Sequence, residues 1–205
     1  MKPQTPDPLI SGLIVAILAD SGFEQEELTG PRDALEKLGA TTRLISVRTG
    51  QIQGFHHDKP ADKFDVALNF EQAQADAFDA VLLPGGVMNA DMIRMSIHAR
   101  QFVQAIDRAG KPVAVICHGA WLLVSAGLVK GRKLTSWPSL QDDIRNAGGE
   151  WCDEQVVQDR NWVSSRKPAD IPAFNARFAD LLRTHARSGG AAPADMGSAN
   201  AGEGG

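Results

Sequence analysis

Short runs of consecutive apolar residues alternate with helical patterns along this chain, and that alternation limits its fold more than any other feature. Residues 13–18 form one such run, and Ala80–Leu83 and Val113–Ile116 form two more. Unbroken apolar runs of this length are typical of strands buried on both faces. Between the runs, residues 27–38 and 96–109 carry apolar side chains at helical spacing. Such strand–helix–strand units predict an α/β fold with a mostly parallel sheet and helices on both faces.

Weaker patterns extend this prediction over a single domain, residues 12–187, whose size suits one buried core. Further strands are expected at residues 42–47, 51–57, 65–70, 133–137, 155–158 and 162–165, and further helices at 119–125, in the segment ending at 146, and at 173–184. Residues 1–11 are polar and are predicted to form a flexible arm. Residues 188–205 are rich in Gly and Ala, bury too little surface to offset their ordering entropy, and are predicted to form a flexible tail.

The charge balance and the cysteine count exclude several classes of protein. The chain has 21 Lys and Arg against 25 Asp and Glu, a net charge of −4, which gives no electrostatic basis for binding nucleic acid. No apolar run approaches the roughly 20 residues that span a bilayer, and no signal-peptide pattern is visible. Two cysteines are too few for a disulfide framework. We therefore expect a cytoplasmic protein with free thiols and no nucleic-acid or membrane partner.

Three segments are expected to meet at the carboxyl ends of the parallel strands, where active sites of open α/β sheets lie. They are residues 20–27, 85–91 and 117–118. Cys117 follows the run Val113–Ile116 and precedes a helical pattern, so it is predicted to stand on a sharp strand-to-helix corner. A helix N-terminus beside the sulfur favours the thiolate, so we expect the thiol pKa to fall. The competing interpretation is an inert buried cysteine.

The neighbours of Cys117 suggest how a reaction would be supported. His118 is a candidate base or ion-pair partner for the thiolate, or else a polar residue in the first helical turn. Gly85 and Gly86 end another strand, where backbone N–H groups can approach a ligand closely. The N–H groups of Gly86 and His118 are candidate oxyanion donors. Taken alone, the Pro84–Gly86 segment is also what an ordinary tight turn requires.

Two acidic residues open the first helix and are candidates for acid–base chemistry. Glu24 and Glu27 are three residues apart, so they share a helix face, whereas Glu26 points elsewhere. Acidic side chains at a helix N-terminus also favour the helix dipole without any other role. Beside a reactive cysteine, a protonated carboxyl group can hydrogen-bond the thiolate or transfer a proton.

No cofactor or metal is expected. His56 and His57 are adjacent and point oppositely on an extended segment, so they do not easily chelate one ion. Neither a Cys-x-x-Cys nor an HExxH motif is present, and the glycines at 85 and 86 lack the surroundings of a nucleotide-binding loop. Cys152 is expected to be structural.

Several motifs in order give the chain a close resemblance to the ThiJ/PfpI family, in particular its PfpI-like intracellular protease branch, over residues 12–183. They are Phe23-Glu24-x-x-Glu27-Leu28, Leu83-Pro84-Gly85-Gly86, Lys111-Pro112-Val-Ala-Val-Ile-Cys117-His118-Gly119, Gly131-Arg132-Lys133-Leu134-Thr135-Ser136 and Asn161-Trp162-Val163-Ser164-Ser165-Arg166. The resemblance implies a flavodoxin-like α/β sandwich. It also implies a nucleophile at Cys117 with His118 beside it, and a glutamate at Glu27 that hydrogen-bonds the cysteine.

The resemblance further implies a site completed in trans by an acid of a neighbouring subunit, and hence a homodimer or larger homo-oligomer. Asp91 is the best candidate for that acid, with a helix N-cap as its alternative role. Where many relatives have Pro-Gln after the glycine, this chain has Ala120-Trp121. Trp121 is therefore expected to narrow the substrate pocket.

The fold and the nucleophile do not fix the reaction. The first hypothesis is a Cys-dependent hydrolase of the intracellular-protease type with a role in stress protection, acting on peptides or small carbonyl compounds. The second is a glyoxalase or deglycase acting on methylglyoxal or glycated groups. The third is a non-catalytic stress chaperone or a redox sensor based on oxidation of Cys117.

Overall fold

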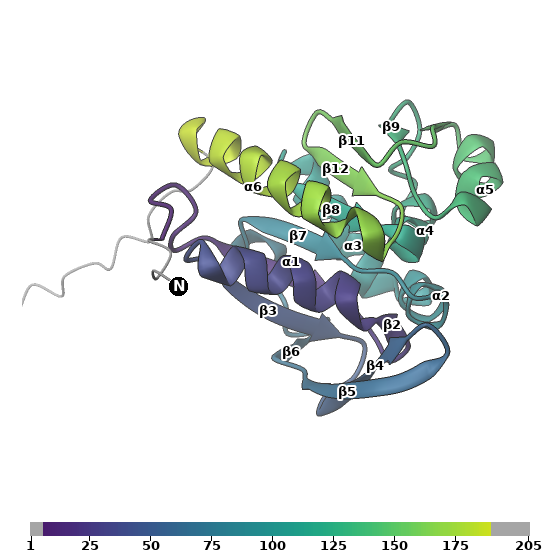
Figure 1. Cartoon of the computed structure of the whole chain (residues 1–205), viewed down its shortest axis with the longest axis horizontal. Coiled ribbons are helices and arrows are strands. Elements are labelled where there is room, and N and C mark those ends of the chain that lie inside the picture. Colours follow the sequence, from purple (N-terminus) through teal and green to yellow (C-terminus); the bar gives the residue numbers. More distant parts are fainter. Residues whose placement is uncertain (1–5, 190–205) are drawn as a thin grey trace, which may run out of the picture.

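A computed structural model describes residues 6–189, which form a layered α/β domain around a seven-stranded sheet (Figure 1). The strand order is β11-β12-β8-β7-β1-β3-β6, and only the pairing of β11 with β12 is antiparallel. Their bounds are β1 Ile14–Leu18, β3 Thr41–Ser46, β6 Leu68–Asn69, β7 Ala80–Leu83, β8 Val113–Ile116, β11 Val156–Asp159 and β12 Trp162–Ser165. The predicted α/β fold with a mostly parallel sheet is confirmed.

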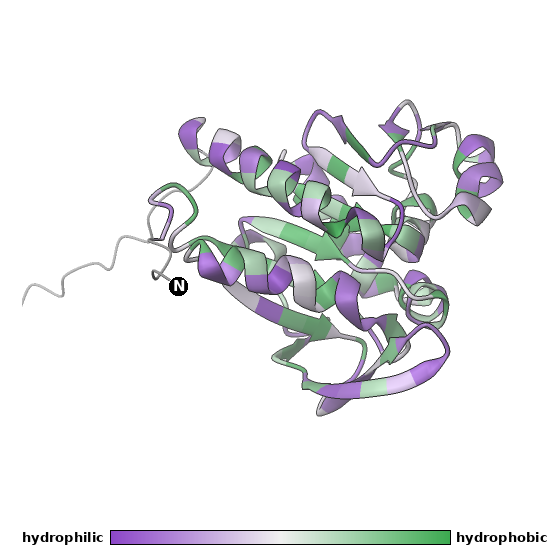
Figure 2. Ribbon diagram, in the orientation of Figure 1, coloured by the Kyte–Doolittle hydropathy of each residue, from purple (hydrophilic) through white to green (hydrophobic). Residues whose placement is uncertain are grey.

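Helices cover both faces of this sheet. α1 (Gln25–Lys37) and α6 (Ile171–Arg187) lie side by side on one face, and α3 (Ile97–Arg108) and α4 (Ala120–Ser125) lie on the other (Figure 1). Alternate residues of β1 explain the two layers: Val15 packs in the core under α1 and α6, and Ala16 packs in the core under α3 and α4. The central strands are therefore apolar at every position, and the helices only on their inner faces (Figure 2).

Two smaller sheets flank the main one. β2 (Phe23–Glu24) pairs in parallel with β4 (Gln51–His56), and β4 pairs antiparallel with β5 (Lys59–Asp65). This excursion places the tip of the β4–β5 hairpin near the start of α1. At the other end of the molecule, β9 (Lys133–Leu134) pairs with β10 (Glu150–Trp151), and α5 (Gln141–Asn146) connects them.

The structure differs from the sequence-based expectation in several places. β5 covers residues 59–65, where no strand was expected before residue 65, and β9 ends at Leu134 instead of at residue 137. No helix was predicted over residues 87–95, but they form α2 (Val87–Met95), separated from α3 only by the helix-capping Ser96. The predicted flexible arm is also too long, because residues 6–11 pack against the domain. Ile10 is fully buried, and the Asp7 carboxylate lies 2.7 Å from Arg183 Nε on α6. The remainder of the predicted arm, and residues 190–205 of the predicted tail, lie outside the described residues.

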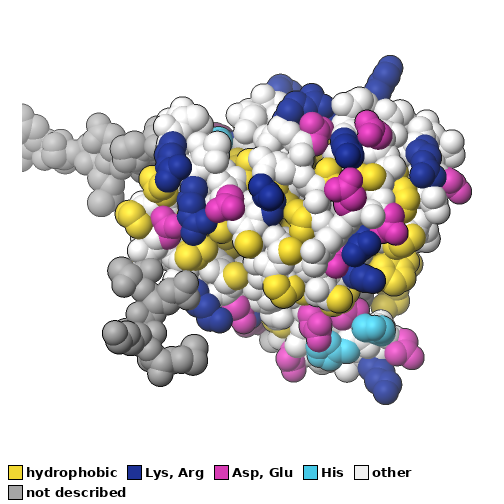
Figure 3. Space-filling view, turned by 45° about the horizontal axis from the view of Figure 1, so that its top comes forward, with side chains coloured by type: hydrophobic (Ala, Val, Ile, Leu, Met, Phe, Trp, Pro, Cys, Tyr) yellow, Lys and Arg dark blue, Asp and Glu magenta, His cyan; other side chains and the backbone are white. Residues whose placement is uncertain are grey.

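Charges of both signs are interspersed over the face of the molecule shown in Figure 3, with hydrophobic side chains between them. Across residues 6–189, no helix has the length and apolar character needed to cross a membrane.

Candidate active site

Cys117 stands on a strained corner directly after β8. Its φ is +61°, a left-handed conformation that is uncommon for a residue with a side chain, and residues Cys117–Gly119 form a single 3-10 turn before α4. Gly119 is needed for this corner, since a Cβ there would lie 2.5 Å from the carbonyl oxygen of Leu83. The sharp strand-to-helix corner predicted from the sequence is therefore present, at a strain that typically costs about 1–3 kcal/mol.

Gly85, at the end of the neighbouring strand β7, lets Cys117 approach the chain. A Cβ on Gly85 would lie 2.6 Å from Cys117 Cβ and 3.0 Å from its Sγ, so only glycine fits. Gly86 has a φ of +89° and caps α2, with its N–H group among those that hydrogen-bond Cys117. The other such group is the N–H of His118. The two donors expected from the sequence thus converge on the sulfur.

Glu27 approaches the same point from α1. It is fully buried, and its Oε2 accepts a hydrogen bond of 2.9 Å from the Gly85 N–H, while Oε1 has no hydrogen-bond partner within the described residues. Burial raises the pKa of Glu27 to about 8, against the hydrogen bonds from Cys117 and Gly85, which lower it. At neutral pH this carboxyl group is therefore mostly protonated and able to donate a hydrogen bond to a thiolate.

The expected fall in the thiol pKa is wrong. Burial raises the pKa of Cys117 above its ordinary value, and the charge of Glu27 raises it further, while the backbone N–H groups of His118 and Gly86 lower it. One short turn cannot outweigh the removal of the sulfur, 7% exposed, from water. Because the effect of Glu27 depends on its charge, a thiolate at Cys117 is compatible only with a protonated Glu27. The two groups are coupled through one proton.

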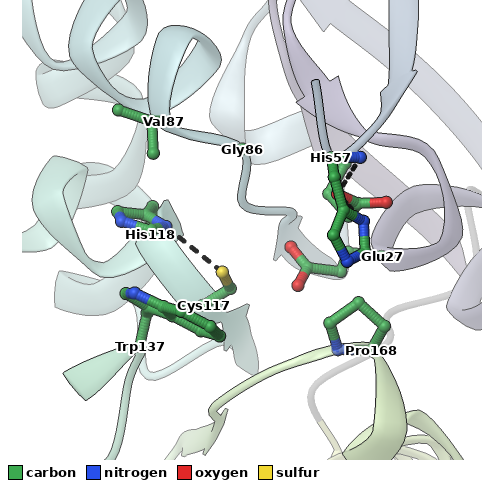
Figure 4. A pocket seen from close by; sticks show the side chains of 9 residues that line it. Glu27, His57, Gly86, Val87, Cys117, His118, Trp137 and Pro168 are labelled. Atoms are coloured by element: carbon green, nitrogen blue, oxygen red, sulfur yellow. Dashed lines mark hydrogen bonds and ion pairs between the residues drawn. The ribbon is translucent and has the colours of Figure 1, made fainter. Parts of the chain in front are cut away.

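His118 lies beside the Cys117 sulfur, on the side opposite Glu27 (Figure 4). Its Nδ1 lies 3.3 Å from Cys117 Sγ, and its ring stacks on Trp137 with centroids 5.9 Å apart. Burial lowers the pKa of His118 to about 4, so the ring is neutral at pH 7. The neutral ring therefore places Nδ1 beside the thiol but carries no positive charge that could pair with a thiolate.

A cavity of about 190 Å³ opens over Cys117 (Figure 4). It is lined by Glu24, Glu27, His57, Gly86, Val87, Cys117, His118, Trp137 and Pro168. Five residues expected from the sequence thus meet in one place, and Gly85 supports them from behind. Glu26 is exposed and faces elsewhere, as expected.

Asp91 does not line this cavity. It lies inside α2 with an exposed side chain, and Gly86 is the N-cap of that helix, so the alternative role of Asp91 as an N-cap is wrong. Three exposed methionines of α2 lie near Asp91: Met88, Met92 and Met95 are 52%, 47% and 73% exposed. Their helical spacing places them on one surface of the helix, and Asp91 lies on the same surface.

The expectation that Trp121 narrows the pocket is also wrong. Its indole Nε1 donates to Asp143 at 2.8 Å, the Arg94 guanidinium lies over its ring at 5.1 Å, and the ring meets that of His118 edge to face without lining the cavity. Trp137 forms the cavity wall instead, and its backbone N–H donates to the Cys117 carbonyl oxygen at 3.3 Å. The sequence analysis did not place Trp137, His57 or Pro168 in the pocket. Each lies in a loop or turn far from Cys117 in sequence, and only the folded chain brings it to the cavity.

Within the described residues, no group of three or more His, Cys, Asp or Glu side chains could hold a metal ion. Cys117 and Cys152 are both free thiols.

Comparison with known proteins finds relatives that match most of the chain. A protein from Thermococcus kodakarensis named as a deglycase is 42% identical over 169 residues, covering 82% of this chain and 99% of the relative. A candidate cysteine protease of Bacillus subtilis is 36% identical over 170 residues, covering 82% of this chain and 98% of that protein. The crystal structure of a ThiJ/PfpI domain protein from Brachyspira murdochii has the same fold, with a TM-score of 0.78 and 21% identity over 85% of this chain and 98% of the other.

Residues 14–181 match the model of one protein family, and this range contains Glu27, Gly85 and Cys117. The expected resemblance and the flavodoxin-like fold are confirmed, and the chain belongs to the DJ-1/PfpI family.

Proposed function

We propose that the chain is a Cys117-dependent hydrolase of small carbonyl adducts, which releases reactive carbonyl groups as a deglycase does and so protects against carbonyl stress. The observation that carries the proposal is the meeting of Cys117, Glu27 and His118 at the floor of a cavity of about 190 Å³. A cavity of this size admits a small head group, whereas an extended peptide needs an open groove. The deglycase name of the relative from Thermococcus kodakarensis supports the same chemistry.

The geometry supports a simple sequence of steps. The Cys117 sulfur forms a bond to the aldehyde carbon of methylglyoxal while the thiol proton passes, by way of neutral His118 Nδ1, to the carbonyl oxygen. The electron pair of the C=O bond moves to that oxygen, where the N–H groups of Gly86 and His118 are available as donors. The carboxyl group of Glu27 then moves a proton from this carbon to the neighbouring carbonyl carbon as the hydroxyl proton shifts to the second oxygen, which converts the adduct into a thioester. Water adds to the thioester, the C–S bond breaks, the sulfur regains a proton from the water, and lactate leaves. In an amine adduct, the C–N bond breaks as the C–S bond forms, and the thiol proton leaves with the amine.

Peptide hydrolysis is the second candidate, and it rests on the name of the Bacillus subtilis relative. A redox-sensing role suits the geometry less well, because sensor thiols are accessible and have lowered pKa values, and Cys117 is 7% exposed with a raised pKa.

The test is turnover of methylglyoxal and of methylglyoxal adducts of N-acetyl-lysine, measured beside casein and fluorogenic peptides. We expect turnover of the small substrates alone. Cleavage of peptides without turnover of the small carbonyl compounds would replace this proposal with the protease.

The exposed face of α2 supports a homodimer or larger homo-oligomer as the working form. Val87, which is 53% exposed, both lines the cavity and adjoins the methionines of this face. A second copy docked on α2 would therefore cover the rim of the cavity. In that arrangement Asp91 of the partner subunit is the candidate acid for His118. The free thiols of Cys117 and Cys152 suit the reducing cytoplasm.

Met92→Lys tests the oligomer by placing a charge in the centre of this face. We expect the variant to sediment as a monomer and to lose activity, whereas Met88→Leu leaves both unchanged. A fully active monomeric wild type would rule out a site completed in trans.

A further inference from the structure

Two polar residues that line the cavity, Glu24 and His57, take no part in the steps proposed at Cys117. In Figure 4 the Glu27 carboxyl group lies between the Cys117 sulfur and the His57 ring. Cys117, His118 and Glu27 form its floor. Glu24 and His57 lie at the mouth, where the His57 side chain is 83% exposed and that of Glu24 only 12% exposed. Most of the remaining wall is apolar and consists of Val87, Trp137 and Pro168. A small substrate whose carbonyl carbon lies at Cys117 therefore meets its next polar partner at the mouth.

The backbone of His57 is held in a conformation that its own turn would normally give to glycine. His56 pairs with Lys59, so residues 57 and 58 form a two-residue hairpin loop between β4 and β5. The φ of His57 is +60°, whereas Asp58 is not left-handed. Loops of this kind strongly favour Gly at their first position. The hairpin alone gives no reason for a histidine here, so we look for that reason in the side chain.

Glu24 fixes both the backbone and the ring of His57. Its Oε2 accepts the His57 N–H at 3.0 Å and lies 3.6 Å from the ring Nδ1. Its Oε1 lies 3.9 Å from Nδ1 of His56. At the end of the molecule where β4 and β5 meet, histidine side chains lie among acidic ones (Figure 3). With Nδ1 beside Glu24, the Nε2 of His57 remains for a ligand, and the ring points into the cavity (Figure 4).

We propose that His57, oriented by Glu24, is a substrate-binding residue whose Nε2 hydrogen-bonds the polar group next to the carbonyl carbon that Cys117 attacks. This role rests on the proposed function. It specifies that the preferred substrate carries a hydroxyl, amino or second carbonyl group beside the reacting carbon. A simple aldehyde without such a group uses the floor of the cavity but not its mouth.

The test compares His57→Gly with His56→Ala. Glycine at position 57 keeps the hairpin, because it adopts the positive φ without strain, and it removes only the ring. His56→Ala removes the neighbouring imidazole, which also faces Glu24 but does not line the cavity. Thermal unfolding is measured for both variants. We expect His57→Gly to be as stable as the wild type or slightly more stable.

For methylglyoxal, we expect His57→Gly to raise KM about tenfold with little change in kcat, the effect of losing one hydrogen bond to the substrate. His56→Ala leaves both constants unchanged, and His57→Asn, which tolerates a positive φ, retains part of the binding. An unchanged KM in His57→Gly, or an equal rise in His56→Ala, would overturn the proposal.

A second measurement separates this proposal from the proposed function. Iodoacetamide alkylates Cys117 and carries an amide group beside the reacting carbon. The iodoacetamide concentration that gives the half-maximal rate of Cys117 alkylation, followed by mass spectrometry of the Cys117-containing peptide, should rise about tenfold in His57→Gly and not in His56→Ala, whether or not the wild type turns over methylglyoxal. If it does not rise, the binding role of His57 fails. If it rises in a protein without turnover, only the proposed function fails.

Discussion

The two cysteines of this chain occupy regions that differ in almost every respect that affects reactivity. Cys117 is buried on a strained corner between Glu27 and His118, beneath a cavity. Cys152 follows β10, is half-buried, and its Sγ lies 3.7 Å from the carbonyl oxygen of Leu134. The more exposed thiol lies beside Glu154 and Lys133 and does not line the cavity over Cys117. The difference is that the sulfur of Cys117 is buried together with an acid, an imidazole and hydrogen-bond donors.

The largest expected effect comes from removing each thiol in turn. Cys117→Ala should lower kcat/KM for small carbonyl adducts about a thousandfold or more, because the bond-forming atom is lost. Cys152→Ala should leave kcat/KM within about a factor of two, since it touches none of the groups that line the cavity. Steady-state kinetics of both variants give the answer. Equal losses would show that the two regions are not functionally different.

A smaller effect is expected from Glu27→Gln, which keeps the shape of the side chain but cannot transfer a proton. We expect kcat to fall about a hundredfold, the usual contribution of a positioned acid or base. Glu154→Gln is the matched control beside Cys152, where the carboxylate pairs with Lys133 at the surface. A rate that survives Glu27→Gln would mean that Glu27 only supports the fold.

The pH dependence of stability should differ between the wild type and Glu27→Gln. The pKa of Glu27 is raised by burial from 4.5 to about 8, so the folded protein binds a proton that the unfolded chain releases. Between these values the free energy of unfolding should decrease as pH rises, by a few kcal/mol at most, and this decrease should vanish in Glu27→Gln. Denaturant unfolding of both proteins at pH 5 and pH 8 measures it. A parallel pH dependence in the two proteins would contradict the raised pKa.

His118 acts in the opposite direction at lower pH. Its pKa is depressed from 6.5 to about 4, so between these values the unfolded chain binds a proton that the folded protein does not. The free energy of unfolding therefore decreases as pH falls through this range. Because this contribution is the same in the wild type and in Glu27→Gln, the difference between the two proteins isolates Glu27.

Much of this molecule was predictable because its signals are local. The apolar runs of β1, β7 and β8 identified the parallel sheet, and their carboxyl ends placed Cys117 near Gly85 and Glu27. The sharp corner followed from a strand that runs directly into Cys-His-Gly. These features depend on residues close together in sequence or on one general property of parallel sheets.

The remainder depends on three-dimensional packing that sequence patterns do not encode. The thiol pKa was misjudged because it depends on how deeply Cys117 is buried beside Glu27. Trp121 and Trp137 lie 16 residues apart, and only the path of the chain after α4 decides which of them walls the cavity. α2 was missed because apolar residues lie on its exposed face, at Met88, Met92 and Met95, as well as on its buried face. Its sequence therefore lacks the periodicity of a helix with one apolar face.

The central claim is that Glu27 holds a proton for Cys117 at neutral pH. The most direct measurement is the titration of the Glu27 side-chain carboxyl carbon by NMR in the folded protein, with Glu27→Gln to assign its signal. The account predicts that this carboxyl group titrates near pH 8. A titration near the ordinary glutamate value of 4.5 would contradict the account, because Cys117 would then face a carboxylate that opposes its thiolate.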